Sequence, residues 1–81
     1  MFRKLIESLD LEIDGCRYQT HYFEHRTARG ARRFSCEVLI AVGDRIIVDD
    51  DSLTSLQAKV MRVVPATVYS RVIARRRSEA A

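Results

Sequence analysis

The amino-acid sequence predicts an α+β domain: an antiparallel four-stranded β-meander followed by a C-terminal helix that is broken or kinked at Pro65. Three observations predict this fold. Apolar and polar residues alternate with the period of a strand through much of residues 9–48. Three glycine-containing segments divide that stretch into hairpins. After residues 49–51 the apolar spacing changes to the period of a helix.

The length and composition indicate one globular domain. The chain has 81 residues, which is enough for a single core. Apolar residues make up 47% and charged residues 31%, with three Gly and one Pro, so the chain is neither disordered nor of low complexity. We expect residues 1–77 to form the compact domain and residues 78–81 to form a frayed tail.

The first hairpin is predicted around Asp14-Gly15, a dipeptide suited to a tight two-residue turn with positive φ. With this loop, apolar residues face apolar residues and acids face bases. The expected pairs are Ile13 with Cys16, Glu12 with Arg17, Leu11 with Tyr18, and Leu9 with Thr20. Residues 2–6 either extend the first strand or form a short helical turn.

The register of the second hairpin follows from the face that its strands must share. A two-residue loop at Arg29-Gly30 would put the apolar residues of the next strand on the wrong face, because side chains alternate with period two. A loop of three or five residues keeps one core face, with Gly30 in the left-handed conformation. The expected pairs are then Tyr22 with Cys36, Thr20 with Val38, and Tyr18 with Ile40.

The third turn, at Gly43-Asp44, leaves two registers open. A two-residue loop turns Leu39, Ala41, Ile46 and Val48 away from the core. A three-residue loop turns out Leu39 and Ile47 instead. In both registers the outer face carries apolar residues, and Phe23 joins them, which is typical of an interaction surface.

The last third of the chain is predicted to be helical in two pieces. Ser52 can act as the N-cap, and the acidic run before it suits the positive end of the helix dipole. Pro65 interrupts the pattern and suits the first turn of a second piece. The second piece either folds back on its own sheet or packs against a second copy. The apolar positions are Leu53, Leu56, Val60, Val63 and Val64, then Val68, Tyr69, Val72 and Ile73.

Charge is distributed in alternating blocks. Residues 1–15 carry −2, residues 16–36 carry +4, residues 37–51 carry −4 and residues 52–81 carry +5, which sum to the net charge of +3. Such blocks create local fields that orient a charged partner or align two copies of one chain. Together with the leftover apolar stripe of the helix, they favour a homodimer.

Zinc and disulfide chemistry are both disfavoured by the predicted strands. Cys16 and Cys36 are the only cysteines and lie too far apart along the sheet to be bridged. Alternation points both of them toward the core as buried free thiols, whereas His21 and His25 point outward. We therefore expect no metal site and no cofactor.

Catalytic equipment is not evident in the sequence. His21 is expected opposite Glu37, but no nucleophile, oxyanion-hole motif or phosphate-binding glycine loop accompanies that pair. The expectation is that the protein is not an enzyme. No apolar run has the length of a membrane-spanning helix or of a signal peptide, so we expect a cytoplasmic protein that does not enter membranes.

Two binding functions remain. The first is a small non-enzymatic module of the regulator, adaptor or inhibitor type, which associates with a protein partner and with itself through Phe23, Leu39 and Ile47. The second is nucleic-acid binding by the tip of the second hairpin, where arginines can neutralise phosphates. The tip residues are Arg26, Arg29, Arg32 and Arg33.

Overall fold

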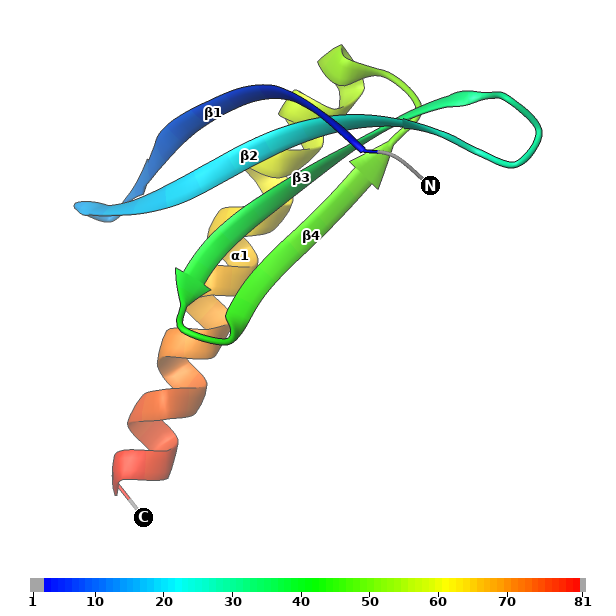
Figure 1. The fold of residues 1–81 in the computed structure, drawn as a ribbon. Coiled ribbons are helices and arrows are strands. Elements are labelled where there is room, and N and C mark those ends of the chain that lie inside the picture. The colour runs from blue at the N-terminus through cyan, green and yellow to red at the C-terminus, as the bar shows by residue number, and fades with distance from the viewer. Residues whose placement is uncertain (1–2, 81) are drawn as a thin grey trace.

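The predicted meander and C-terminal helix are both confirmed. The computed structural model describes the backbone of residues 3–80 and the side chains of residues 3–74. Its elements are β1 (Lys4–Ile13), β2 (Cys16–Arg26), β3 (Arg32–Ala41), β4 (Asp44–Asp50) and α1 (Leu53–Ala80). The strands form one antiparallel sheet in the order β1-β2-β3-β4 (Figure 1). We call the face that α1 covers the inner face and the opposite one the outer face.

The first hairpin has the predicted register. Asp14 and Gly15 have φ values of 51° and 80°, and positive φ at both central residues is the geometry of a type I′ turn, which matches the twist of paired strands. The ladder contains the four predicted pairs, from Ile13 with Cys16 to Leu9 with Thr20. Farther along, the register of β1 shifts between Leu5 and Glu7. The strand begins at Lys4, which settles the alternative left open for residues 4–6, while Phe2 lies outside the described residues.

The second hairpin has the odd loop that the shared core face required. Arg26 pairs with Arg32, so residues 27–31 form a five-residue loop, and Gly30 has a φ of 84°. Within this loop, the Ala31 carbonyl accepts a hydrogen bond of 2.9 Å from the Thr27 amide. The predicted pairs Tyr22 with Cys36 and Thr20 with Val38 are present, and the ladder ends there, before Tyr18 and Ile40.

The third turn resolves the open register through an irregularity in β3. Ala41 pairs with Asp44, but the register shifts between Leu39 and Ala41, so that Leu39 pairs with Arg45. The extra residue restores the alternation of β4 and turns Ile46 and Val48 toward the core. The loop consists of Val42 and Gly43, so the turn lies one residue before the predicted Gly43-Asp44 and no three-residue loop forms. Leu39 and Ile47 nevertheless lie on the outer face, as expected for the three-residue loop.

Ser52 caps the helix as predicted, and α1 begins at Leu53. The Ser52 hydroxyl accepts a hydrogen bond of 3.2 Å from the Ser55 amide, and the Ser52 carbonyl accepts one of 3.0 Å from the Leu56 amide. The side-chain bond satisfies one of the free amides at the helix start.

The predicted break at Pro65 is wrong, and a kink there is not shown. α1 runs through Pro65 as one helix of 28 residues. Proline removes one amide donor from the interior of a helix. Near this position the Thr67 hydroxyl donates a hydrogen bond of 2.9 Å to the Val63 carbonyl. Val64 and Val68, on either side of the proline, are both buried against the sheet, so the same packing stabilises the helix on both sides of Pro65.

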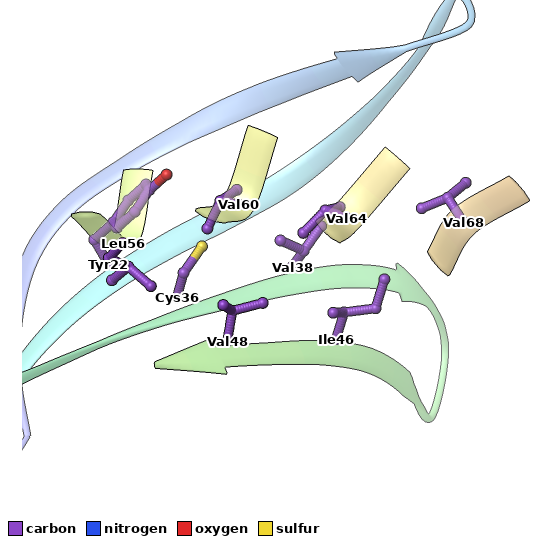
Figure 2. Packing of buried hydrophobic residues seen from close by; sticks show 9 residues of the cluster. All are labelled: Tyr22, Cys36, Val38, Ile46, Val48, Leu56, Val60, Val64 and Val68. Atoms are coloured by element: carbon purple, nitrogen blue, oxygen red, sulfur yellow. The ribbon is translucent and has the colours of Figure 1, made fainter. Parts of the chain in front are cut away.

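The core lies between α1 and one half of the sheet (Figure 2). Its helical side is a row of residues spaced by four, which places them on one face of the helix. Its other side comes mainly from β3 and β4, on which the helix packs. The buried apolar residues are Tyr22, Cys36, Val38, Ile46, Val48, Leu56, Val60, Val64 and Val68.

One helix covers about half of this sheet. A helix is about 10 Å across and neighbouring strands lie about 4.8 Å apart, so α1 spans roughly two strands. It packs on β3 and β4, and its C-terminal part continues past the turn that joins them (Figure 1). Because the chain does not break at Pro65, no second piece returns over β1 and β2.

Candidate functional site

The inward-facing apolar residues of β1 and β2 lie beside the helix instead of under it. Leu9 is 37% exposed, although it pairs with Thr20, whose side chain is completely buried. Leu11, Ile13 and Tyr18 are half-buried and pack against the edge of the core. We call these four residues the uncovered strip. They were predicted to be core residues. They are apolar and face inward as core residues do, but no helix packs directly over them.

An apolar flank of the helix borders the uncovered strip. The Lys59 ammonium donates a hydrogen bond of 3.0 Å to the Asp49 carbonyl, so this flank of α1 lies beside the edge strand β4. Met61 is two residues farther on, or about 200° around the helix, and therefore lies on the flank nearer to β1 and β2. Val72 lies four residues after Val68 and continues the row that faces the sheet. Met61 is 63% exposed and Val72 is 39% exposed.

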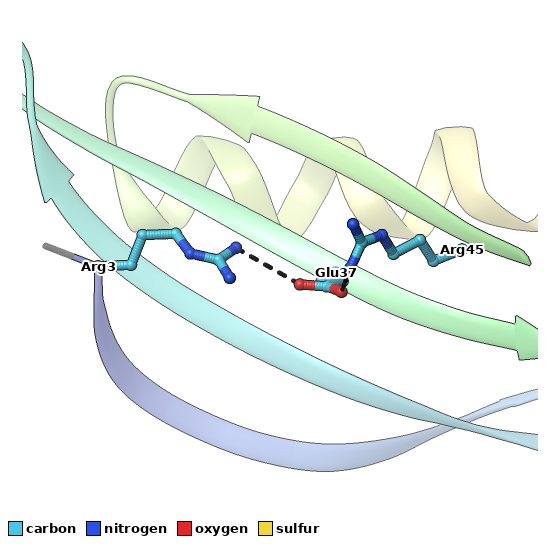
Figure 3. A network of polar contacts seen from close by, with 3 residues as sticks. All are labelled: Arg3, Glu37 and Arg45. Atoms are coloured by element: carbon cyan, nitrogen blue, oxygen red, sulfur yellow. Dashed lines mark hydrogen bonds and ion pairs between the residues drawn. The ribbon is translucent and has the colours of Figure 1, made fainter. Parts of the chain in front are cut away.

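The outer face has a charged centre. Glu37 on β3 is only 8% exposed and accepts bonds from two arginines, at 3.4 Å from Arg3 and at 2.7 Å from Arg45 (Figure 3). The guanidinium of Arg3 also lies 4.3 Å from the ring centroid of Phe23, within the range of a cation–π interaction. Phe23 is half-buried in this arrangement.

The three residues predicted to bind a protein partner all lie on this face. Leu39 is 36% exposed and Ile47 is 58% exposed, whereas Phe23 lies beneath the Arg3 guanidinium. Glu37 lies directly opposite Ile47 and separates it from the Phe23 side of the sheet. The outer apolar surface is therefore divided by an ion network and is not one continuous patch.

The arginines at the tip are partly neutralised by carboxylates of the same sheet. Arg32 donates to Glu24 at 2.6 Å, and Arg33 donates to Asp49 at 2.9 Å. Hydrogen bonding from Arg32 holds the pKa of Glu24 below its usual value, and the carboxylate partners raise the pKa of Arg32 and Arg33. Arg26 is 3.5 Å from the Gly30 carbonyl. Within the side chains of residues 3–74, Arg29 has no hydrogen-bond or ion-pair partner.

The histidines and cysteines are not assembled into a metal site. No group of three or more His, Cys, Asp or Glu side chains suited to a metal ion occurs within the described part of the chain. His21 is hydrogen-bonded through Nδ1 to the Ser8 hydroxyl at 2.7 Å. Cys36 is buried as predicted, but the prediction of a buried Cys16 is wrong: it is exposed, because it begins β2 in the half of the sheet that the helix leaves open.

Cys36 and Tyr22 form a buried neutral pair. They lie opposite each other on β3 and β2, and both side chains face α1 (Figure 2). Burial raises the pKa of Cys36 to about 11. Burial, with a smaller effect of Cys36, raises the pKa of Tyr22 to about 12. Since the thiolate is the nucleophilic form of cysteine, Cys36 is an inert core thiol at neutral pH.

No protein-family model matches the chain, and comparisons with curated proteins and with solved structures find no significant match. In the part of the chain that the structure describes, no helix combines the length and apolar character that crossing a membrane requires.

The uncovered strip is the feature that the sequence interpretation missed. Its residues alternate correctly and were assigned to the core from that alternation, while the sequence left open whether a second helical piece folds back over the sheet. Comparing the diameter of a helix with the width of the sheet would have revealed the strip, because a single helix cannot cover four strands. The continuity of α1 through Pro65 decides how many helices the sheet receives.

Proposed function

We propose that the protein is a small non-enzymatic binding module that acts through protein–protein association, including association with itself. The observation that carries the proposal is the partly covered inner face, where Leu9 is exposed and Leu11, Ile13 and Tyr18 are only partly buried. Apolar residues on a contiguous exposed surface are typical of a protein interface. We further propose that the strip accepts an amphipathic helix of a partner protein.

A helix fits this surface by width and by chemistry. At its open end the β1–β2 hairpin is two strands wide, which is about the diameter of one helix, whereas Thr20 and Tyr22 farther along β2 are buried. Apolar residues at helical spacing would enter between β1 and the exposed flank of α1, as in helix-in-groove recognition. Full burial of Leu9 or Met61 would contribute about 1–2 kcal/mol each. Glu7 lies in the same inward row of β1, which favours a basic residue at the edge of the partner helix.

The proposal is tested by photo-crosslinking from adjacent positions of β1 that face opposite sides. A photoreactive amino acid is placed at Leu9 in one variant and at Asp10 in a matched control, and both are expressed in cells. We expect one recurrent adduct from position 9 and none from position 10, because successive strand residues point to opposite faces. With the purified partner, Leu9→Asp should then weaken binding about tenfold or more, as burial of a charge opposes docking.

Two results would contradict the helix-accepting strip. Equal adducts from positions 9 and 10 would show that labelling follows exposure and not the inner face. Binding of the purified partner that is unchanged by Leu9→Asp would place the interface elsewhere. An adduct with twice the mass of the chain would identify a second copy as the occupant.

A second candidate is nucleic-acid binding through Arg26, Arg29, Arg32 and Arg33. It is supported by the unpaired guanidinium of Arg29, which is exposed in the loop of the second hairpin. It is weakened by the ion pairs of Arg32 and Arg33, which a phosphate would have to replace. Protein association is therefore the function that the geometry supports best.

A further inference from the structure

We propose that the free edge of β4 pairs with β4 of a second copy. The two strands run antiparallel about a two-fold axis through Ile47 and join the two sheets into one sheet of eight strands. This inference rests on the self-association part of the proposed function and assigns it a surface and a register. The uncovered strip is not involved and stays open at both ends of the joined sheet.

The outer edge of β4 is available for pairing. β4 is the last strand of the sheet, and its register with β3 is regular from Arg45 to Asp50. Among residues 3–80, no backbone hydrogen bond joins its outer edge to another element. Among the side chains of residues 3–74, that of Lys59 alone donates a hydrogen bond to a β4 carbonyl, that of Asp49 near the end of the strand. An edge of this kind presents unpaired amides and carbonyls to another strand.

The sequence of β4 is complementary to itself in this register. On the outer face, Ile47 meets Ile47 of the second copy, and Arg45 meets Asp49 of the second copy. On the inner face, Ile46 meets Val48 of the second copy, beneath the two helices. Opposite charges and apolar pairs placed directly across two strands stabilise their pairing.

Neighbouring registers lose this match. A shift of two residues in one direction places Ile47 opposite Asp49 and Ile46 opposite Asp50. A shift in the other direction places Arg45 opposite Ile47. A shift of one residue joins the inner face of one copy to the outer face of the other, because side chains alternate with period two. The register about Ile47 is therefore the one that the residues specify.

Arg45 and Asp49 meet across the line where the two β4 strands pair, which we call the seam. Each of them also keeps an ion-pair partner within its own copy. The side chains of Arg45 and Asp49 are each 58% exposed, although Arg45 contacts Glu37 and Asp49 contacts Arg33. Pairing of two copies would extend these contacts into an alternating row: Glu37, Arg45, then Asp49 and Arg33 of the second copy. At each end of the seam Asp44 meets Asp50 of the second copy, and the ion pair of Asp44 with Arg71 in its own chain offsets that repulsion.

The other edge of the sheet does not offer the same match. β1 is interrupted by the register shift between Leu5 and Glu7. In the register that pairs all ten of its residues with a second β1, Glu7 meets Asp10. Irregularities and like charges are the features by which edge strands avoid pairing. Self-association through β4 therefore closes at a dimer and does not continue into a fibre.

Charge reversal at the seam tests the register. We expect Arg45→Asp alone and Asp49→Arg alone to raise the dissociation constant of the dimer by about tenfold or more, because each puts two like-charged pairs at the seam. Mixing the two variants should restore a dimer, since one of the two contacts between positions 45 and 49 is then reversed, the other keeps its wild-type charges, and both join opposite charges. Sedimentation equilibrium measures all three samples, and thermal unfolding followed by circular dichroism verifies that each is folded. The matched control is a charge reversal at an exposed residue of β2, Arg17→Asp, which should leave the dissociation constant unchanged.

A disulfide provides a test that does not depend on charge. In a Cys16→Ser background, Ile47→Cys should form a covalent dimer on mild oxidation, because directly opposite strand residues have Cα atoms about 4.5–5.5 Å apart. Arg45→Cys in the same background should not, since it lies opposite residue 49 of the second copy. The register is refuted if the charge-reversed variants dimerise like the wild type, if their mixture stays monomeric, or if Arg45→Cys crosslinks as efficiently as Ile47→Cys. A wild-type chain that is monomeric at every concentration refutes the dimer but leaves the crosslink from Leu9 to a partner unaffected.

Discussion

At the scale of single residues, burial and charge place side chains where alternation alone would not. Glu37 points to the outer face, yet it is among the least exposed polar residues because Arg3 and Arg45 cover it from both sides (Figure 3). It thereby divides the apolar residues of that face. On the inner face, Cys36 and Tyr22 are held neutral by burial against the helix.

The pH dependence of stability should reveal the Cys36–Tyr22 pair. Above pH 9.0, its ordinary pKa, Cys36 loses its proton in the unfolded chain but keeps it in the folded chain up to about pH 11. Unfolding is therefore favoured as the pH rises, and the stabilising contribution of the neutral thiol is lost over this interval. We expect Cys36 to account for about 2 kcal/mol of the fall in the free energy of unfolding, at about 1.4 kcal/mol per pKa unit.

Urea unfolding at pH 8, 9, 10 and 11 measures this loss. Cys36→Ala is the comparison, because it removes the thiol and should flatten the decline between pH 9 and 11 even if it is less stable throughout. Parallel declines in the wild type and the variant would show that the thiol is not protected from ionisation by the fold.

At the scale of elements, the continuity of α1 is the decisive feature. Proline in a helix interior usually costs about 3 kcal/mol, and here the buried positions Val64 and Val68 hold the helix together across it. A break would have produced two short helices behind four strands. The unbroken helix instead leaves β1 and the start of β2 uncovered and extends its own C-terminal part beyond the sheet (Figure 1).

Pro65→Ala should stabilise the protein. Alanine restores the missing amide and the best helix propensity, so we expect the free energy of unfolding to rise by about 1–3 kcal/mol. The neighbouring exposed substitution Ala66→Gly should lower it by about 1 kcal/mol, because glycine is unfavourable inside a continuous helix. Chemical denaturation of both variants measures the changes. No effect of either substitution would mean that the helix is interrupted at residue 65 in solution.

At the scale of the whole molecule, the charge blocks largely neutralise one another through ion pairs within the fold. The basic hairpin tip lies next to the acidic end of β4, where Arg33 meets Asp49, and Arg71 of the helix meets Asp44 at the other end of the same strand. Alternating blocks along the chain thus become adjacent opposite charges in space. Little of the positive charge of the tip is left for a long polyanion.

Nucleic-acid binding is accordingly expected to be weak, and its affinity should depend only slightly on the salt concentration. The dissociation constant for random duplex DNA, measured by gel shift across a salt series, gives a slope of log affinity against log salt. We expect about −2 at most, as for two free arginines, and not about −4, as for all four tip arginines. Arg29→Ala should abolish any shift seen at low salt. A slope near −4 would show that phosphates displace Glu24 and Asp49 and would favour the second candidate.

Much of this fold follows from local pattern. The registers of the first two hairpins were predictable because one core face had to be shared, and Ser52 was recognisable as a cap because of its position before the helical spacing. The candidate surfaces were less accessible. Phe23, Leu39 and Ile47 were correctly placed on the outer face, but the ion network of Glu37 that divides them depends on Arg3, which is 34 residues away.

The sequence by itself determined the order of the elements, the strand pairing and the identity of the inward-facing residues, because these depend on periods of two and 3.6 and on turns of a few residues. Tertiary structure alone decided which inward-facing residues are actually buried. That outcome depends on whether one helix stays whole across Pro65 and on which two strands it covers. These are consequences of packing between distant segments, and they leave one half of the sheet as a core and the other half as a surface.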